Sequence, residues 1–170
     1  MSKHSKATRF HSIGAPVRGK GVIVEREHDP YRAKAKPAEP TACPECHAVF
    51  HAGRWQWLEN PAEAHEALCP ACQRLRDRFP AGYVTLGGDL LRDHKNEVME
   101  LVKHRAEHAR DEHPLQRLME IQEQPGAVQI TTTDTHLARG IGEALHHAYR
   151  GELKFRYEHG QELLRVHWTR

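Results

Sequence analysis

The cysteines of this chain occur in two matched pairs. Cys43 and Cys46 are separated by a proline and a glutamate, Cys69 and Cys72 are separated by a proline and an alanine, and the 170-residue chain has no other cysteine. Two short turns that together supply four thiolates are the usual ligand set of a tetrahedral zinc site. Because four thiolates leave no open coordination position, the pattern predicts one structural Zn²⁺ rather than a catalytic one.

Other uses of these cysteines are considered beside the zinc site. The pairs are separated by twenty-two residues, slightly more than the usual template, and a short hairpin that carries Trp55 and Trp57 would accommodate the difference. A redox pair is expected to open a helix within a βαβ unit, and an iron–sulfur cluster is a further competitor. His47 or His65, which lie close to the cysteines in sequence, could replace one thiolate.

The composition and charge of the chain indicate where the protein is located in the cell and which kinds of molecule it binds. No run reaches the ~18 apolar residues of a membrane span, and "MSKHSKATRFHSIG" lacks the apolar stretch of a secretory signal. We therefore expect a cytoplasmic protein without a membrane partner, in which disulfides are disfavoured. Residues 1–40 carry nine Lys/Arg against four Asp/Glu, whereas residues 79–170 carry twelve against fourteen. A basic arm suits nucleic acid, and a solvated leader is the alternative.

The chain divides into three segments that would position these residues. Residues 1–40, rich in Gly and Pro, predict a basic flexible arm. Residues 41–78 predict the zinc-ribbon module, and residues 79–170 predict an α+β domain. The predicted fold class is therefore α+β, with a small four-cysteine zinc ribbon followed by an α/β sandwich that ends in a β-hairpin.

Periodicity predicts the elements of the third segment. Asp134 precedes an apolar helical stripe and suits its N-cap, and Gly140 and Gly142 inside that stripe are expected to allow close packing. The expected elements are a strand and turn over 82–91, helices over 93–113 and 114–124, a strand over 127–134, a helix over 135–151 and a hairpin over 152–170.

Basic residues suggest a nucleic-acid surface. The terminal hairpin alternates, so that one face should enter the core through Leu153, Phe155, Tyr157, Leu164, Val166 and Trp168. The opposite face would then present Lys154, Arg156, Arg165 and His167 as an RNA platform. Near the cysteines, phosphate contacts are expected from Arg54, Arg74, Arg76 and Arg78, with stacking on Trp55 and Trp57. The alternatives are solvated cations and tryptophans that fill the core of the zinc module.

Catalytic motifs are weak. "GAPVRGKG" at 14–21 approaches the phosphate-binding pattern G-x-x-x-x-G-K-[ST], but Gly21 replaces the hydroxyl residue. No helix pattern follows it, although a phosphate loop needs a helix N-terminus. No Ser/His/Asp set stands out either. We therefore expect a protein that is not an enzyme, with an ATPase as the less favoured alternative.

Five stretches resemble a known family: "CPECHAVFHAGRW", "LCPACQRLRDRFPAGYVTL", "EHPLQRLMEI", "ITTTDTHLARGIGEALHHAYRGEL" and "VHW". Across residues 41–170 the chain resembles a family of short bacterial proteins. That family is similar to the archaeal and eukaryotic export adaptor of the large ribosomal subunit, named for nonsense-mediated decay. Bacteria have no nuclear envelope, so the resemblance implies contact with the large subunit or its RNA rather than export. It also implies that Cys43, Cys46, Cys69 and Cys72 are metal ligands.

The functional expectation combines these observations. We expect a zinc-binding, non-enzymatic RNA-binding protein that associates with the ribosome or its RNA. The alternative is a protein-binding adaptor or a transcription-linked regulator that uses the same zinc module. A continuous basic hairpin face would favour RNA, and an acidic or apolar face would favour the adaptor.

Overall fold

A computed structural model of the chain describes residues 30–31, 36–158 and 162–170. It contains a small four-stranded sheet and a larger five-stranded sheet, together with four helices in the described ranges. The class is α+β, as predicted. We call residues 41–78 the four-cysteine module and residues 79–170 the α+β body. "GAPVRGKG" and the arm around it lie outside the described residues.

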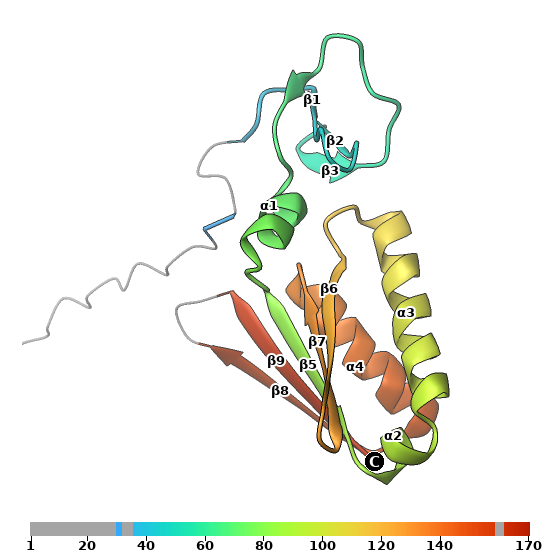
Figure 1. The fold of residues 1–170 in the computed structure, drawn as a ribbon. Coiled ribbons are helices and arrows are strands. Elements are labelled where there is room, and N and C mark those ends of the chain that lie inside the picture. Colours follow the sequence, from blue (N-terminus) through green and yellow to red (C-terminus); the bar gives the residue numbers. More distant parts are fainter. Residues whose placement is uncertain (1–29, 32–35, 159–161) are drawn as a thin grey trace, which may run out of the picture.

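The four-cysteine module consists of short strands and one helix (Figure 1). Its sheet has the order β3-β2-β1-β4, with β1 antiparallel to β2 and parallel to β4. Helix α1 leads from the module into the body. The bounds are β1 Thr41–Ala42, β2 Val49–His51, β3 Arg54–Gln56, β4 His65–Glu66 and α1 Pro70–Asp77.

The sheet of the α+β body has the order β6-β7-β5-β9-β8. Neighbouring strands in this sheet run antiparallel, except that β5 and β9 run parallel to each other. The predicted terminal hairpin therefore forms one edge of the sheet. The bounds are β5 Gly82–Gly87, β6 Leu118–Gln124, β7 Ala127–Thr132, β8 Glu152–Glu158 and β9 Leu163–Thr169.

Helices cover one face of this sheet (Figure 1). They are α2 Asp89–Asp93, α3 Lys95–Glu112 and α4 Thr135–Tyr149. The predicted N-cap of α4 is confirmed, because the Asp134 carboxylate accepts hydrogen bonds from the backbone N–H groups of His136 and Leu137. A Cβ on Gly142 would lie 2.6 Å from Val166, so this glycine allows α4 to approach β9.

The core lies between the sheet and the helices. Trp168 is its largest fully buried side chain, and its indole Nε1–H donates to the Arg150 carbonyl over 2.8 Å. Alternation along the strands sends one set of side chains into this layer and the other set to the opposite face. The sheet and helix residues that fill the core include Val84, Leu86, Val98, Val102, Ile130, Leu137, Ile141, Leu145, Leu164 and Val166.

The predicted helix over 114–124 is wrong. Residues 118–124 form strand β6, which pairs antiparallel with β7 through a turn at Pro125 and Gly126. Gly126 has φ +74°, a conformation that suits glycine. The apolar residues fitted a helical stripe locally, but β7 offers an open hydrogen-bonding edge. Pairing with that edge outweighs the local helical preference.

The predicted burial of the β8 ladder is also wrong in part. Phe155 is 37% exposed and Tyr157 is 54% exposed, whereas Leu153 packs against the core. Strand β8 is the edge strand, so its side chains have a neighbouring strand on one side only. Phe155 lies beside the N-terminal half of α4, where the Arg139 guanidinium is 5.1 Å from its ring centroid. The burial of Leu164, Val166 and Trp168 on β9 is confirmed.

Every helix in the described part of the chain is too short or too polar to cross a lipid bilayer.

Candidate functional site

The four cysteines converge on one point of the module. Cys43 and Cys46 lie in the turn between β1 and β2, while Cys69 is the N-cap of α1 and Cys72 lies in its first turn. The four sulfur atoms lie within 4.8 Å of one another. Cys43, Cys69 and Cys72 are buried, and Cys46 is partly exposed. Residues far apart in the sequence therefore form one compact sulfur cluster.

Backbone amides direct two of these sulfurs. The N–H of Cys69 donates to Cys43 Sγ over 3.4 Å, and the N–H of Cys72 donates to Cys69 Sγ over 3.4 Å. Hydrogen bonds of this kind favour the charged form of an acceptor. Pro70 supports the second turn, because proline is favoured in the first turn of a helix and has no N–H to leave unpaired.

The sulfurs ionise unequally when no cation balances them. A hydrogen bond with the Cys69 thiol lowers the pKa of Cys46 to about 4, and the same contact raises the pKa of Cys69. Burial raises the pKa of Cys72 to about 12. The cluster therefore keeps protons at neutral pH that a metal must displace. Metal affinity should fall as the pH falls, since the ligands must be deprotonated.

The spacing of the sulfurs fits a tetrahedral ion. Zn–S bonds of about 2.3 Å place the sulfurs of a tetrahedral site roughly 3.8 Å apart. The Sγ atoms of Cys46 and Cys69 lie 3.6 Å apart, a distance that a disulfide cannot span. Neither His47 nor His65 joins the sulfurs within the described ranges, so the group positioned to hold an ion consists of the four cysteines.

The redox alternative loses support from the context of the pairs. Cys69 and Cys72 do open a helix, α1, as a redox pair would. However, α1 connects β4 of one sheet to β5 of the other, so it is not part of a βαβ unit. All four sulfurs also share one centre, whereas a redox pair needs only two.

Arg117 joins the α+β body to the sulfur cluster, and the sequence pattern did not identify it. Its Nη1 donates to Cys72 Sγ over 3.4 Å, and its Nη2 lies 4.0 Å from Cys69 Sγ. Two further bonds fix it: Nε donates to the Pro114 carbonyl over 2.7 Å, and its backbone N–H donates to Thr133 Oγ1 over 2.9 Å. A four-thiolate zinc centre has a net negative charge, which this guanidinium would partly offset.

Replacing Arg117 with glutamine is therefore expected to lower metal affinity by roughly 10- to 100-fold, the usual cost of losing an outer-shell partner. Competition with a chromogenic zinc chelator measures this. Arg110→Gln is the matched control: both guanidinium carbons lie 5.9 Å from the Trp57 ring, and only that of Arg117 reaches the sulfurs. Equal affinities in the two variants would contradict the assigned role.

The predicted cations near the cysteines have different surroundings. The expected phosphate contact is wrong for Arg74, because this residue is only 3% exposed. Its Nη1 donates to the Phe79 carbonyl, and its guanidinium lies 4.5 Å from the centroid of the Tyr31 ring. Arg76 pairs with Glu45. Arg78 is exposed at the left-handed C-cap of α1, and Arg54 is exposed on β3. Of the four, only Arg54 and Arg78 combine exposure with freedom from acidic partners in the described ranges.

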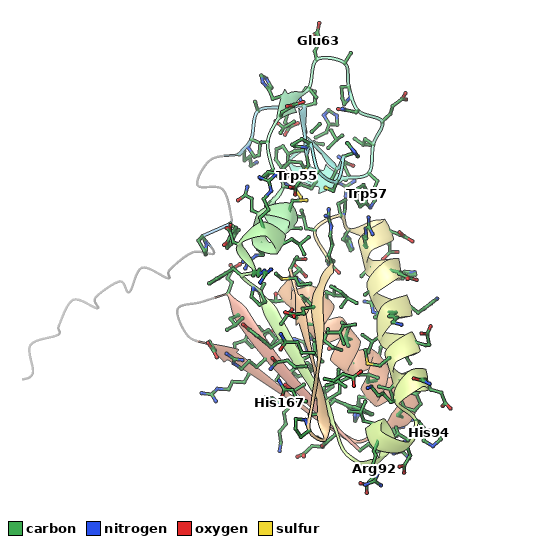
Figure 2. The ribbon with its side chains drawn as sticks, viewed as in Figure 1. Trp55, Trp57, Glu63, Arg92, His94 and His167 are labelled. Atoms are coloured by element: carbon green, nitrogen blue, oxygen red, sulfur yellow. The ribbon has the colours of Figure 1, made fainter. Side chains whose placement is uncertain are left out.

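The two tryptophans do not act as a pair. Trp55 packs against the cysteine cluster and lies 5.6 Å from the Phe50 ring, so it contributes to the small core. Trp57 is 36% exposed and its Nε1–H donates to the Arg110 carbonyl over 2.7 Å. Figure 2 shows Trp57 beside the end of α3. Trp57 thus joins the module to the body instead of filling the module core.

The face of the large sheet opposite the helices carries the predicted hairpin cations. Lys154 pairs with His167 across the strands, and Arg156 pairs with Arg165, so all four lie on that face. Tyr83 of β5 joins them, with the Arg165 guanidinium 4.6 Å from its ring centroid. Figure 2 shows His167 on this side. We call Tyr83, Lys154, Arg156, Arg165 and His167 the open sheet face; no described element covers it.

The charge of the open sheet face is partly neutralised. Lys154 lies 2.7 Å from Glu152, and Arg165 lies 2.6 Å from Glu158. Arg156 has no acidic partner within the described residues. The hairpin face is therefore basic but not continuously so. Tyr83 could have been found from the sequence only by knowing that β5 lies beside β9.

The fold and the site together define an α+β protein with a four-cysteine module positioned to hold a metal ion. No family model matches the chain, and comparison with curated proteins and with solved structures gives no match. The functional conclusion therefore depends on the geometry of the sulfur cluster and of the open sheet face.

Proposed function

We propose that the chain is a zinc-stabilised, non-enzymatic RNA-binding protein that contacts the large ribosomal subunit or its RNA. The observation that carries this proposal is the open sheet face, where one aromatic ring and four basic or titratable side chains share one uncovered surface. Aromatic rings stack with unpaired bases, and cations contact the phosphates between them. The contact with the ribosome is proposed from the sequence resemblance.

Zinc is the proposed metal because the ligands are four thiolates on a small scaffold. Soft sulfur ligands in a tetrahedral arrangement select zinc or iron–sulfur iron. The sulfurs surround a single centre, which suits one ion. With four protein ligands the ion has no position for a substrate, so its proposed role is to hold the module together and to fix α1 relative to the body.

Arg156 offers the clearest test of the RNA surface. Arg156→Glu is expected to weaken binding of a single-stranded oligoribonucleotide and to flatten the salt dependence by roughly 0.7 in the log–log slope for each phosphate that the protein no longer neutralises. Fluorescence anisotropy at several salt concentrations measures both quantities. Folding should persist because Arg156 is exposed and points away from the core.

Lys103→Glu is the control for this test, because it makes the same change in charge on the helical layer. Lys103 is half exposed on α3 and pairs only with Glu100 among the described residues. If both variants lose RNA binding equally, the loss is caused by the change in net charge. That result would contradict the assignment of the open sheet face as the RNA-binding surface. Association with ribosomes that survives in a protein unable to bind RNA would favour the adaptor.

A further inference from the structure

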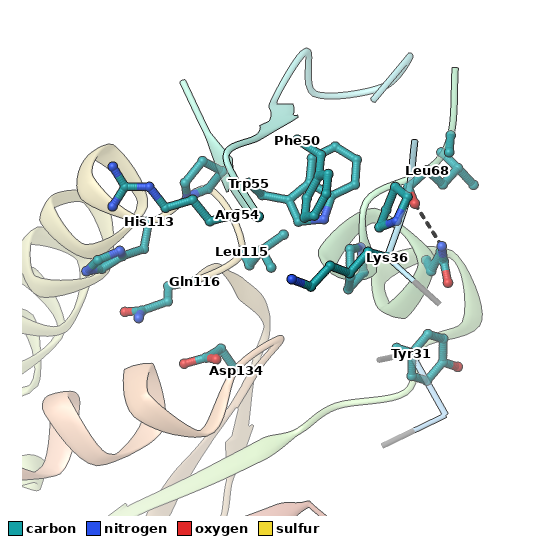
Figure 3. Close-up of a pocket in the computed structure, with 16 residues that line it drawn as sticks. Tyr31, Lys36, Phe50, Arg54, Trp55, Leu68, His113, Leu115, Gln116 and Asp134 are labelled. Carbon is teal, nitrogen blue, oxygen red and sulfur yellow. Dashed lines mark hydrogen bonds between the residues drawn. The ribbon is translucent and has the colours of Figure 1, made fainter. Parts of the chain in front are cut away.

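A cleft of about 720 Å³ lies between the four-cysteine module and the α+β body. Figure 3 shows the side chains that line it. The module contributes Phe50, Trp55 and Leu68, and the body contributes Leu115 and Gln116. Its size is within the range of pockets that bind small organic groups. Neither the metal centre nor the open sheet face includes this cleft, although its walls contain residues beside the metal ligands.

One side of the cleft is apolar and aromatic. The Phe50 and Trp55 rings lie 5.6 Å apart at an interplanar angle of 59°. Trp55, Leu68 and Leu115 are each only partly buried and pack against the cysteine cluster. These three side chains therefore lie between the cleft and the four cysteines, and their positions depend on the folded cysteine cluster. A partly exposed indole beside aliphatic side chains is a suitable surface for a flat ring.

The rim of the cleft is cationic and polar. Lys36 and Arg54 line it, and neither forms an ion pair with any described residue. Gln73 donates its Nε2 to the Leu68 carbonyl over 2.8 Å, which leaves its amide oxygen as an acceptor. Asp134 is the acidic residue of the lining and is occupied as the N-cap of α4. The rim thus favours an anionic group next to a ring with polar edges.

A short segment of the chain connects α1, which lines the cleft, to β5, which carries Tyr83 of the open sheet face. Gln73 of α1 lines the cleft, and the chain then leaves α1 at Asp77 and enters β5 at Gly82, beside Tyr83. Tyr83 and Arg165 are neighbours on adjacent parallel strands and lie side by side on the open sheet face near that end of the sheet. Gly82, next to Tyr83, lies near the cleft, because a Cβ on Gly82 would be 3.4 Å from the carbonyl oxygen of Asp134, which lines the cleft. A single strand of nucleic acid that contacts Tyr83 is therefore near the cleft.

We infer that this cleft binds one unpaired nucleotide of an RNA strand, with its base against Trp55 and with Lys36 and Arg54, on opposite sides of the cleft (Figure 3), contacting phosphates of the strand on either side of that base. A base supplies the flat ring and the polar edge, and the phosphates on either side of it supply the anions. This inference rests on the proposed RNA-binding function and adds to it a site for an unpaired base. Base–aromatic contacts tolerate many sequences, so the cleft needs an unpaired base rather than one particular base.

Photocrosslinking tests the site in the full chain with its metal bound. The probe is a short single-stranded oligoribonucleotide that carries one 5-iodouridine, and mass spectrometry maps the linked peptide. We expect crosslinks at Trp55. Replacing the iodouridine by an abasic nucleotide should lower affinity by roughly 5- to 150-fold, the range expected when one stacked base is removed.

Arg54→Glu should lower the crosslinking yield at Trp55 by about tenfold, equivalent to a loss of about 1.4 kcal/mol, with the zinc content unchanged. Lys103→Glu, which changes the charge equally but lies on α3 outside the cleft, should leave the yield unchanged. An oligonucleotide that binds but crosslinks only to Tyr83 would contradict the cleft as a nucleotide site, while the proposed RNA-binding function would still hold. An oligonucleotide that does not bind at all would overturn both.

Discussion

Replacing Cys43 with serine is expected to unfold the four-cysteine module while the α+β body stays folded. Binding of a structural zinc ion contributes roughly 10–16 kcal/mol in small metal-dependent modules, so loss of one ligand removes much of their folding free energy. The strands of the module contain only two or three residues each, and its buried cluster is built around the cysteines themselves. Without the ion, little else holds this segment together.

The body should survive because its core is separate. The apolar cluster between the large sheet and α3 and α4 contains no residue of the module. Elemental analysis should find one zinc per chain in the unmodified protein and much less in the variant. In two-dimensional NMR spectra of the variant, the amide signals of residues 41–78 should lose their chemical-shift dispersion, and those of the body should keep it.

His47→Asn is the control for the cysteine variant. His47 neighbours Cys46, is exposed and has φ +63°, a conformation that asparagine tolerates better than most residues. The control should keep one zinc per chain. Loss of zinc in the control, or full zinc occupancy in Cys43→Ser, would contradict the four-thiolate assignment. Iron with visible colour would contradict zinc.

Trp168→Ala is expected to cost ~3–5 kcal/mol of folding free energy, as large-to-small changes do in a packed core. The side chain is fully buried, and its removal also leaves the Arg150 carbonyl without its donor. For a domain of this size the loss corresponds to a fall in Tm of roughly 6–20 °C. Thermal and urea denaturation followed by circular dichroism measure it.

Tyr157→Ala is the matched control, because this ring lies on the neighbouring strand and on the same side of the sheet. Tyr157 is 54% exposed, so its truncation should cost less than about 1 kcal/mol. A large loss of stability for Tyr157→Ala, or a small one for Trp168→Ala, would contradict the observed division between covered centre and exposed edge.

Features that depend on local chemistry could be predicted from the amino-acid sequence. Two C-P-x-C turns identified the four cysteines whose sulfurs converge, because few other arrangements use cysteine in that way. Asp134 before an apolar stripe identified the start of α4, since capping and periodicity act within a few residues. The alternation of β9 likewise identified Leu164, Val166 and Trp168 as core.

Features that depend on contacts between distant segments could not be predicted in this way. Residues 118–124 could pair as a strand only because β7 presents an edge, and Tyr157 is exposed because β8 has no further strand beside it. Arg74 is buried because Tyr31 and Phe79 surround it, and Arg117 reaches the sulfurs across a long stretch of chain. Burial and charge pairing are set by contacts between remote segments, which local periodicity does not specify.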